Sequence, residues 1–487
     1  MKLDLKGKIN RIYVQSLCMM FYHGAKFPVN EDNTDGLELI LSTEERDGGV
    51  YCFAIMRDNG REAAFDSFCP FSEYDSEDRT YKVAIGQAIY RAGISLTGKE
   101  AKWGILTGIR PSKVVADILS IHNEDEAKAI LTDKYLLDIS KADLACTVAK
   151  NETDILERTD DGKCSIYISI PFCPSRCSYC SFISYAGKKL FSLIPSYLER
   201  LNKDIISTLD MVKDNGLKVC SIYIGGGTPT ILDEEQLKTL LATVSSCIDV
   251  SSLEEFTLEG GRPDTITEKK LSIAKEYGIT RISVNPQTLN DSVLEKIGRN
   301  HTVDEFLTAY EKVKNSGIKH INTDLIAGLD TDTFESFKAS VDKIIKLDPD
   351  NVTVHSFCVK NASRIRSDDK DIYTKNDDIA RRSVEYSIEA LTKAGYIPYY
   401  MYRQKNTVDN LENVGYAKKG TFGLYNVYMM SDAHTVFGIG AGATTKLVRH
   451  IDGKTEILRI FSPKYPYEYL QEEKDEAQKI KNFFERS

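Results

Sequence analysis

The chain has 487 residues, which is more than one domain usually contains, so we expect several domains. Hydrophobic residues make up 42% and charged residues 28%, the balance of an ordinary globular protein. The formal net charge of −9 disfavours a nucleic-acid partner, because such proteins are usually basic.

Residues 1–150 are predicted to form a small accessory domain of the α+β class. The first ten residues, MKLDLKGKIN, are charged throughout and do not resemble a secretory signal. Eleven cysteines without such a signal indicate a reducing compartment, so we expect a cytoplasmic protein. The expected strands are Ile9–Val14, Glu38–Leu41 and Val50–Met56, and the expected helices are Tyr81–Ala92, Glu124–Asp133 and a segment that starts near Pro111.

From residue 164 the pattern changes to short β-type runs separated by amphipathic stretches. The runs lie at 165–170, 221–224, 255–258, 281–284, 321–326 and 351–354. The helical stretches include Ile194–Val212, Glu234–Ser246 and Val303–Ser316. Strands that alternate with helices are typical of parallel βα units. We therefore expect an α/β core over residues 164–380, built as an open sheet or, as we prefer, a partial (β/α)6 barrel of the TIM type.

The segment 381–487 is predicted to form a C-terminal α+β cap on this core. Strand-like runs lie at Tyr425–Met430, Thr435–Ile439 and Lys446–Phe461. The pair Asp452-Gly453 indicates a hairpin turn inside the last run. A charged helix is expected from about Tyr467. No stretch of the chain approaches the roughly 18 apolar residues of a membrane span, so none is expected.

Three cysteines cluster in the string YISIPFCPSRCSYCSF, namely Cys173, Cys177 and Cys180. The other cysteines are scattered and are expected to pack as small apolar side chains. Thiolates are strong ligands for iron–sulfur clusters. Three thiolates on a cluster of four irons leave one iron open to another ligand. Zinc is the alternative, but a structural zinc site normally has four ligands, and no fourth cysteine or histidine lies nearby.

Polar or glycine residues follow each of the next strands. The segment Gly225–Pro229 (GGGTP) comes directly after the second run, where glycine would let the backbone approach a ligand or simply make a tight turn. A phosphate loop is disfavoured because its Lys-Ser/Thr pair is missing. Later runs end near Glu259, Gln287, Asp324 and His355. Because the carboxyl ends of barrel strands form the site face, we predict that these side chains line one mouth beside the cysteine loop.

The spacing CxxxCxxC after a short β-run resembles the signature of the radical S-adenosylmethionine (SAM) superfamily. In that superfamily the amino and carboxylate groups of SAM bind the open iron of a [4Fe–4S] cluster. One electron from the cluster cleaves SAM to methionine and a 5′-deoxyadenosyl radical, which takes a hydrogen atom from the substrate.

A narrower resemblance is to the oxygen-independent coproporphyrinogen III oxidase family. It rests on YISIPFCPSRCSYC, YIGGGTPT, RISVNPQTLN, IGRNH and TDLIAGL. The strings LTGIRPSK, EGGRPDTIT, MYRQKN, LENVGYA and IGAGATTK extend it over nearly the whole chain, to the HemZ branch, coproporphyrinogen dehydrogenase. The resemblance implies that Cys173, Cys177 and Cys180 hold the cluster. The implied SAM contacts are Tyr167, Tyr179, Gly226, Gly227, Thr228, Glu259, Gln287, Arg299 and Asp324.

The activity that this resemblance implies is the oxidative decarboxylation of coproporphyrinogen III to protoporphyrinogen IX in haem biosynthesis. The implied partners are a porphyrinogen or other tetrapyrrole and a low-potential electron donor such as flavodoxin or ferredoxin. A substrate with four propionates needs cationic side chains around it. The candidates are Arg262, Arg403 and Lys405, with Arg176 as a further one, and the alternative for each is a solvated surface charge.

One departure separates this chain from the best-known members of the family. They carry a further cysteine two residues after the triplet, where this chain has Ser181 and then Phe182. The haem-chaperone branch of the family also lacks that cysteine. Two alternatives therefore stay open, a haem-trafficking chaperone and a radical SAM enzyme that acts on haem or another substrate. An RNA-modifying enzyme is disfavoured by the acidic composition.

Overall fold

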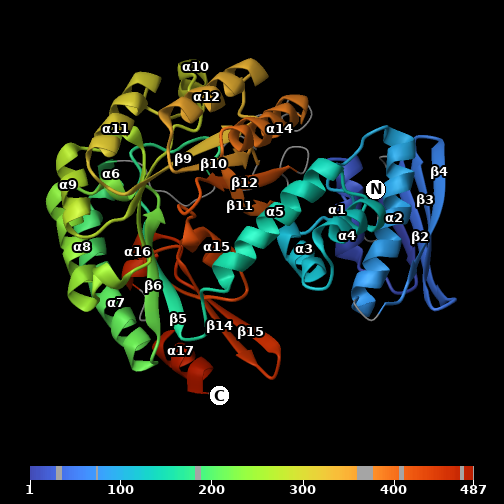
Figure 1. The fold of residues 1–487 in the computed structure, drawn as a ribbon, viewed down its shortest axis with the longest axis horizontal. Coiled ribbons are helices and arrows are strands. Elements are labelled where there is room, and N and C mark those ends of the chain that lie inside the picture. Colours follow the sequence, from blue (N-terminus) through green and yellow to red (C-terminus); the bar gives the residue numbers. More distant parts are fainter. Residues whose placement is uncertain are drawn as a thin grey trace. The chain divides into compact units, whose positions relative to one another are not determined.

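The computed structural model describes residues 1–28, 36–72, 75–180, 188–358, 377–404, 411–471 and 476–485 (Figure 1). The chain divides into two compact units. The first contains Met1–Lys150 together with Arg403–Lys405, and the second contains Asn151–Tyr402 and Asn406–Ser487. The division after residue 150 coincides with the end predicted for the accessory domain.

The first unit contains a four-stranded sheet in the order β1-β2-β3-β4. Its strands are β1 (Lys2–Lys6), β2 (Leu37–Arg46), β3 (Gly49–Asp58) and β4 (Arg61–Pro70). Helix α2 (Glu77–Thr97) packs against β3 and β4. The smaller elements are α1 (Arg11–Phe21), α3 (Pro111–Leu119), α4 (Glu124–Ala129), a π-helical turn (Ile130–Lys134) and the start of α5 (Ile139–Leu156).

The predicted strand at Ile9–Val14 is wrong, because this segment begins helix α1. The side chain of Asn10 caps the helix by accepting a hydrogen bond from the Tyr13 N–H (3.1 Å). The buried residues Val14, Leu17 and Phe21 then repeat at helical spacing. A run of only six residues was too short to reveal that period.

The second unit is built on one large sheet in the order β11-β12-β10-β9-β8-β7-β6-β5-β13-β14-β15. The six predicted core strands are confirmed as β5 (Lys163–Ile170), β6 (Lys218–Gly226), β7 (Glu255–Gly261), β8 (Arg281–Val284), β9 (His320–Ala327) and β10 (Asn351–Ser356). They pair in parallel in chain order. This arrangement is the βα architecture that the sequence predicted.

Helices cover the outer side of these strands (Figure 1). They are α7 (Ile194–Asp214), α8 (Glu234–Cys247), α9 (Glu268–Glu276), α10 (Asp291–Lys296), α11 (Val303–Asn315), α12 (Phe334–Leu347) and α14 (Asp377–Lys393). The strand residues on this side are apolar and fully buried, for example Ile166, Ile168, Ile222 and Ile224. The alternate residues are mostly polar and face the other way, into the barrel.

The segment after residue 380 adds strands to both edges of the same sheet, so it extends the sheet of the core. Its strands are β11 (Ile397–Arg403), β12 (Glu412–Ala417), β13 (Thr435–Ile439), β14 (Thr444–Ile451) and β15 (Lys454–Phe461). The hairpin predicted at Asp452-Gly453 joins β14 to β15. The chain then forms α16 (Pro466–Gln471) and α17 (Glu476–Glu485). None of the described helices is long and apolar enough to cross a membrane.

The predicted strand at Tyr425–Met430 is wrong, because these residues form helix α15 (Leu424–Met430). The Glu255 carboxylate, at the start of β7, accepts hydrogen bonds from the Leu424 N–H (2.9 Å) and the Tyr425 N–H (3.3 Å). Arg281, at the start of β8, donates to the Thr421 carbonyl (2.9 Å) just before the helix. The helix is therefore held at the amino ends of the barrel strands.

Candidate functional site

The cysteine loop follows β5 at the carboxyl end of the barrel. Cys177 is buried, and Cys173 and Cys180 are partly exposed. Within the described part of the chain, no three His, Cys, Asp or Glu side chains converge on a single metal-ion position. An iron–sulfur cluster takes each thiolate on a different iron, so its ligands need not converge on one point.

The cysteine loop is anchored to the segment that follows helix α10. The Ser178 N–H donates to the Ile297 carbonyl (2.9 Å), and the Ser175 hydroxyl donates to the Gly298 carbonyl (3.0 Å). Gly298 has a φ of +76°, and a Cβ there would lie 3.3 Å from the Arg176 carbonyl oxygen. A glycine is therefore needed where the two segments meet.

Arg262, the residue that follows strand β7, holds the same loop in place. Its Nη1 donates to the Ser175 hydroxyl (2.9 Å), and its Nε lies 3.1 Å from Asp264 Oδ1. The residue is only 3% exposed. Its buried guanidinium therefore stabilises the cysteine loop, and the substrate contact expected at Arg262 stays a prediction.

The glycine segment after β6 packs directly against the start of the cysteine loop. The Gly227 N–H donates to the Ile170 carbonyl and the Thr228 N–H to the Phe172 carbonyl, both at 2.8 Å. The Thr228 hydroxyl lies 3.3 Å from Cys173 Sγ. A Cβ on Gly227 would come within 2.5 Å of the Phe172 carbonyl oxygen. The predicted glycine motif therefore sets the backbone beside a predicted cluster ligand.

Glu259 lies at the end of β7 and faces this glycine segment. A Cβ on Gly225 would lie 2.6 Å from Glu259 Oε2. Burial, reinforced by the negative charge of Asp324, raises the pKa of Glu259 to about 8. Hydrogen bonds from the Gly226 N–H and the Tyr223 hydroxyl act in the opposite direction. Without a ligand, this carboxyl is therefore mostly neutral at pH 7.

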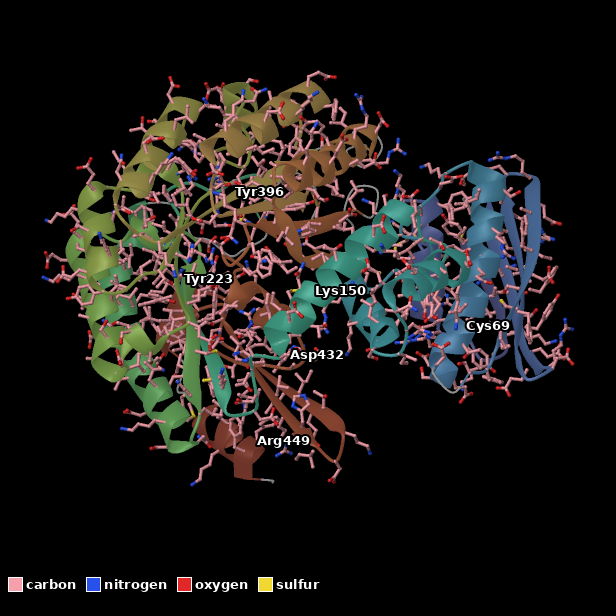
Figure 2. All side chains as sticks on the ribbon, in the orientation of Figure 1. Cys69, Lys150, Tyr223, Tyr396, Asp432 and Arg449 are labelled. Atoms are coloured by element: carbon pink, nitrogen blue, oxygen red, sulfur yellow. The ribbon has the colours of Figure 1, made fainter. Side chains whose placement is uncertain are left out.

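Three tyrosine rings stack inside the barrel beside Glu259. Tyr167 and Tyr223 are register partners on β5 and β6, with ring centroids 6.2 Å apart (Tyr223 is labelled in Figure 2). Tyr425 of α15 lies 4.6 Å from Tyr223 and 6.0 Å from Tyr167. Tyr425 was not predicted as a site residue, and no local signal marks it, because its position depends on how α15 is held.

Arg299 lies at the centre of a second polar group, at the end of β8. Its Nη1 donates to Tyr179 Oη (3.1 Å), and its Nη2 donates to the carbonyls of Asn285 (2.6 Å) and Gly261 (2.9 Å). Three buried polar atoms here have no partner among the described residues, namely Arg299 Nε, Asn285 Oδ1 and Gln287 Oε1.

Buried polar atoms are normally hydrogen-bonded, so these unpaired atoms indicate a missing polar ligand. One unpaired donor and two unpaired acceptors fit the carboxylate and amino groups of an amino acid such as the methionyl part of SAM. The residues present therefore fit the implied cofactor. Asn285 was not predicted, and only its place two residues before Gln287 pointed to it.

Gln287 joins the ends of β8 and β9. Its φ of +71° is unusual for a residue other than glycine. Its N–H donates to the Asp324 carbonyl (3.0 Å), and its carbonyl accepts from the Ile326 N–H (2.9 Å). Asp324 Oδ1 accepts a hydrogen bond from Asn322 Nδ2 (2.9 Å). Gln287 and Asp324 therefore lie together, as expected for side chains at the carboxyl ends of neighbouring strands.

The remaining substrate candidates, Arg403 and Lys405, stay predictions. Arg403 is buried, donates to the Ile109 and Leu106 carbonyls, and lies over the Trp103 ring at 5.4 Å, all within the first unit. Its backbone N–H and its Nη1 thus bind the protein itself, and the substrate contact expected at Arg403 stays a prediction. Lys405 lies outside the described residues, as do Ser181 and Phe182.

Comparisons with known proteins identify the family to which this chain is similar. The family model described as the radical SAM superfamily matches residues 167–344. The oxygen-independent coproporphyrinogen-III oxidase-like protein HemZ of Bacillus subtilis is 34% identical over 465 residues, covering 94% of this chain and 92% of HemZ. The heme chaperone HemW of the same organism is 38% identical over 197 residues, which are 40% of this chain and 51% of HemW.

Among solved structures, coproporphyrinogen III oxidase (HemN) from Escherichia coli shares the fold. It aligns with a TM-score of 0.52 at 20% identity, covering 66% of this chain and 71% of HemN. The chain is therefore a radical SAM protein, of a class that uses a [4Fe–4S] cluster and SAM. Within that class it belongs to the coproporphyrinogen III oxidase family, in which HemZ is a relative along nearly its full length.

Proposed function

We propose that this chain catalyses the oxidative decarboxylation of coproporphyrinogen III propionates to vinyl groups, giving protoporphyrinogen IX. The similarity to HemZ over 94% of the chain supports this substrate, because it includes the segments outside the radical SAM core. The set of unpaired atoms on Arg299, Asn285 and Gln287 supports the SAM chemistry, because it provides for an amino-acid ligand beside the cysteine loop.

In this proposal the cysteine loop holds the cluster through Cys173, Cys177 and Cys180. Arg299 binds the SAM carboxylate, as its charge and its unpaired Nε favour. The backbone of Gly226–Thr228 approaches the SAM amino group. The other proposed SAM contacts are Tyr167, Tyr179, Glu259, Gln287 and Asp324.

When bound, the cluster and SAM supply a 5′-deoxyadenosyl radical that removes a hydrogen atom from the β-carbon of a propionate. The substrate then loses CO2 and passes one electron to an acceptor, which leaves a vinyl group. The residues of the chain orient the reacting carbon and exclude water and oxygen. The tyrosine stack of Tyr167, Tyr223 and Tyr425 fills the barrel below Glu259 and limits water there.

An anaerobic assay tests this proposal. Reconstituted protein is mixed with SAM, a low-potential reductant, an electron acceptor and coproporphyrinogen III, and the tetrapyrroles are separated by chromatography. We expect the mono-vinyl intermediate and then protoporphyrinogen IX, with 5′-deoxyadenosine formed in proportion. If SAM is cleaved and no vinyl product forms, the proposed substrate is wrong.

The second candidate function is haem trafficking. It is favoured by the similarity to HemW proteins and by Ser181-Phe182 where other family members have a further cysteine. A spectral titration with haem distinguishes the two functions. Stoichiometric haem binding without porphyrinogen turnover would favour the chaperone. Turnover of haem or of another substrate would instead identify a different radical SAM reaction.

A further inference from the structure

Tyr223 of β6 lies beside Glu259 of β7, on the side of the two strands that faces the barrel interior (Tyr223 is labelled in Figure 2). The register pairs Tyr223 with Thr257, so Glu259 lies one inward position further along β7. A Cβ on Gly225 would lie 2.6 Å from Glu259 Oε2 and 2.6 Å from Cε1 of the Tyr223 ring. Because glycine has no side chain, the ring and the carboxyl can both lie against Gly225.

The Tyr223 hydroxyl donates a hydrogen bond to the Glu259 carboxyl. Stacking holds the ring that carries this hydroxyl. The centroids of the Tyr425 and Tyr167 rings lie 4.6 and 6.2 Å from it, and the three ring planes are within 23° of parallel. The packing of α15 and β5 therefore fixes the direction in which the hydroxyl points. Tyr223 and Glu259 are both half-buried, so a ligand in the barrel can reach the carboxyl.

Opposing influences act on the Glu259 carboxyl. The titratable groups that face it are Tyr167 of β5, Tyr223 of β6, Asp324 of β9 and Tyr425 of α15. Burial and the negative charge of Asp324 raise the pKa of Glu259, whereas the Gly226 N–H and the Tyr223 hydroxyl lower it. Removal from water raises the pKa of Tyr223 well above its usual range, so its hydroxyl keeps its hydrogen and stays a donor.

We propose that Tyr223 is a positioning residue for SAM, whose hydroxyl holds the Glu259 carboxylate in place for the cationic ligand. Of the two donors to this carboxyl, the Gly226 N–H belongs to the backbone, so Tyr223 is the one that the choice of side chain determines. The inference rests on the proposed SAM contact at Glu259, and it is independent of the porphyrinogen substrate.

The hydrogen bond has a consequence whose sign depends on pH. It stabilises the carboxylate relative to the carboxylic acid, and a cationic sulfonium favours the carboxylate. Without the bond, the pKa of Glu259 should rise by about one unit, because a hydrogen bond to a charged group is lost. SAM affinity then falls at pH values below the pKa of Glu259 and is retained at pH values well above it.

A binding experiment at two pH values tests the inference. SAM is dialysed to equilibrium against anaerobically reconstituted protein without reductant, so that it is not cleaved. We expect Tyr223→Phe to bind SAM about tenfold more weakly at pH 7.0 and within about twofold of the unmodified protein at pH 9.5. Titration of the SAM amino group is common to all variants and cancels in the ratio. Iron content and thermal unfolding check that each protein is intact.

Tyr310 of α11 provides the matched control, because its side chain is fully buried and its hydroxyl donates to the Leu347 carbonyl (3.0 Å). Tyr310→Phe should bind SAM like the unmodified protein at both pH values. In a Glu259→Gln background, Tyr223→Phe should change the Kd by less than about twofold, because the carboxylate that it positions is absent.

Proton release gives a second readout. At pH 8.5 Glu259 should contribute about a quarter of a proton when SAM binds to the unmodified protein, and about three quarters in Tyr223→Phe. Equal weakening of SAM binding at pH 7.0 and 9.5, no weakening at pH 7.0, or unchanged proton release would each overturn the inference. None of these measurements requires turnover, so failure of the decarboxylation assay leaves the result for Tyr223 standing.

Discussion

Glu255 and Lys446 bind the two ends of the same short helix, α15, from strands that lie on opposite sides of the cysteine-bearing strand β5. The Glu255 carboxylate accepts from the first N–H groups of the helix. The buried Lys446 ammonium donates to the carbonyls of Tyr428 (2.8 Å), Met429 (3.1 Å) and Ser431 (2.6 Å). Each charge has the sign that the helix dipole favours at that end.

Lys446→Met should lower the free energy of unfolding by about 2–4 kcal/mol, because buried carbonyls at the end of α15 lose their charged donor. Urea denaturation of the apo-protein measures this change. The exposed Lys454 provides the control Lys454→Met, for which we expect less than about 0.5 kcal/mol. An unchanged denaturation midpoint in Lys446→Met would show that the ammonium does not stabilise α15.

Cys177→Ala should abolish stable binding of a cluster with about four irons per chain, because only two thiolates of the triplet would remain. Iron and sulfide analysis after anaerobic reconstitution measures the loss, and the absorbance near the sulfur-to-iron charge-transfer band follows it. Cys247, partly exposed at the end of α8, gives the control Cys247→Ala, which should keep its iron. Full iron content in Cys177→Ala would rule out the assigned ligand set.

Ionisation of Glu259 should contribute close to one released proton when SAM binds near pH 7. The pKa of Glu259 is about 8 without ligand, so roughly nine-tenths of this carboxyl is protonated at pH 7. A cationic sulfonium nearby favours the ionised form, so the proton leaves on binding and SAM affinity rises with pH through this range. Calorimetry in two buffers of different ionisation enthalpy measures the released proton. Glu259→Gln should release about one proton fewer than the unmodified protein, and the exposed-site control Glu254→Gln should behave like the unmodified protein.

Arg262→Met should make the cluster labile without weakening porphyrin binding. Its guanidinium is bound to Ser175 of the cysteine loop and to Asp264, so its loss frees the loop. We expect iron transfer to a chelator to become about tenfold faster, with the coproporphyrin Kd within about twofold of the original. The control is Arg91→Met on the exposed side of α2. A large rise in Kd with normal iron retention would instead restore Arg262 as a substrate residue.

The core strands could be predicted because they are short β-type runs that alternate regularly with amphipathic helical stretches. That topology also placed Glu259, Gln287 and Asp324 at one end of the sheet, since parallel strands end together. The cysteine loop could be predicted from the spacing of its three cysteines alone. These features depend on local pattern or on the topology of successive βα units, both of which a single sequence contains.

The features that could not be predicted depend on contacts between distant segments. The ends of helix α15 are bound by Glu255, 169 residues before Leu424, and by Lys446, 15 residues after Ser431. His355 was noted from its place at a strand end, but its partner Tyr402 lies 47 residues later. Which of Tyr402 and Arg403 faces the barrel was also undecided, because register fixes the facing side and composition does not.

The pairing of β13 with β5 has a consequence for the order of synthesis. β5 carries the cysteine loop and is hydrogen-bonded on one side to β6 and on the other to Thr435–Ile439. Until the ribosome has delivered those late residues, β5 is an edge strand with unpaired backbone groups. A nascent chain that ends before residue 435 would thus expose the strand that leads into the cysteine loop, so pairing of both edges of β5 must follow translation of Thr435–Ile439.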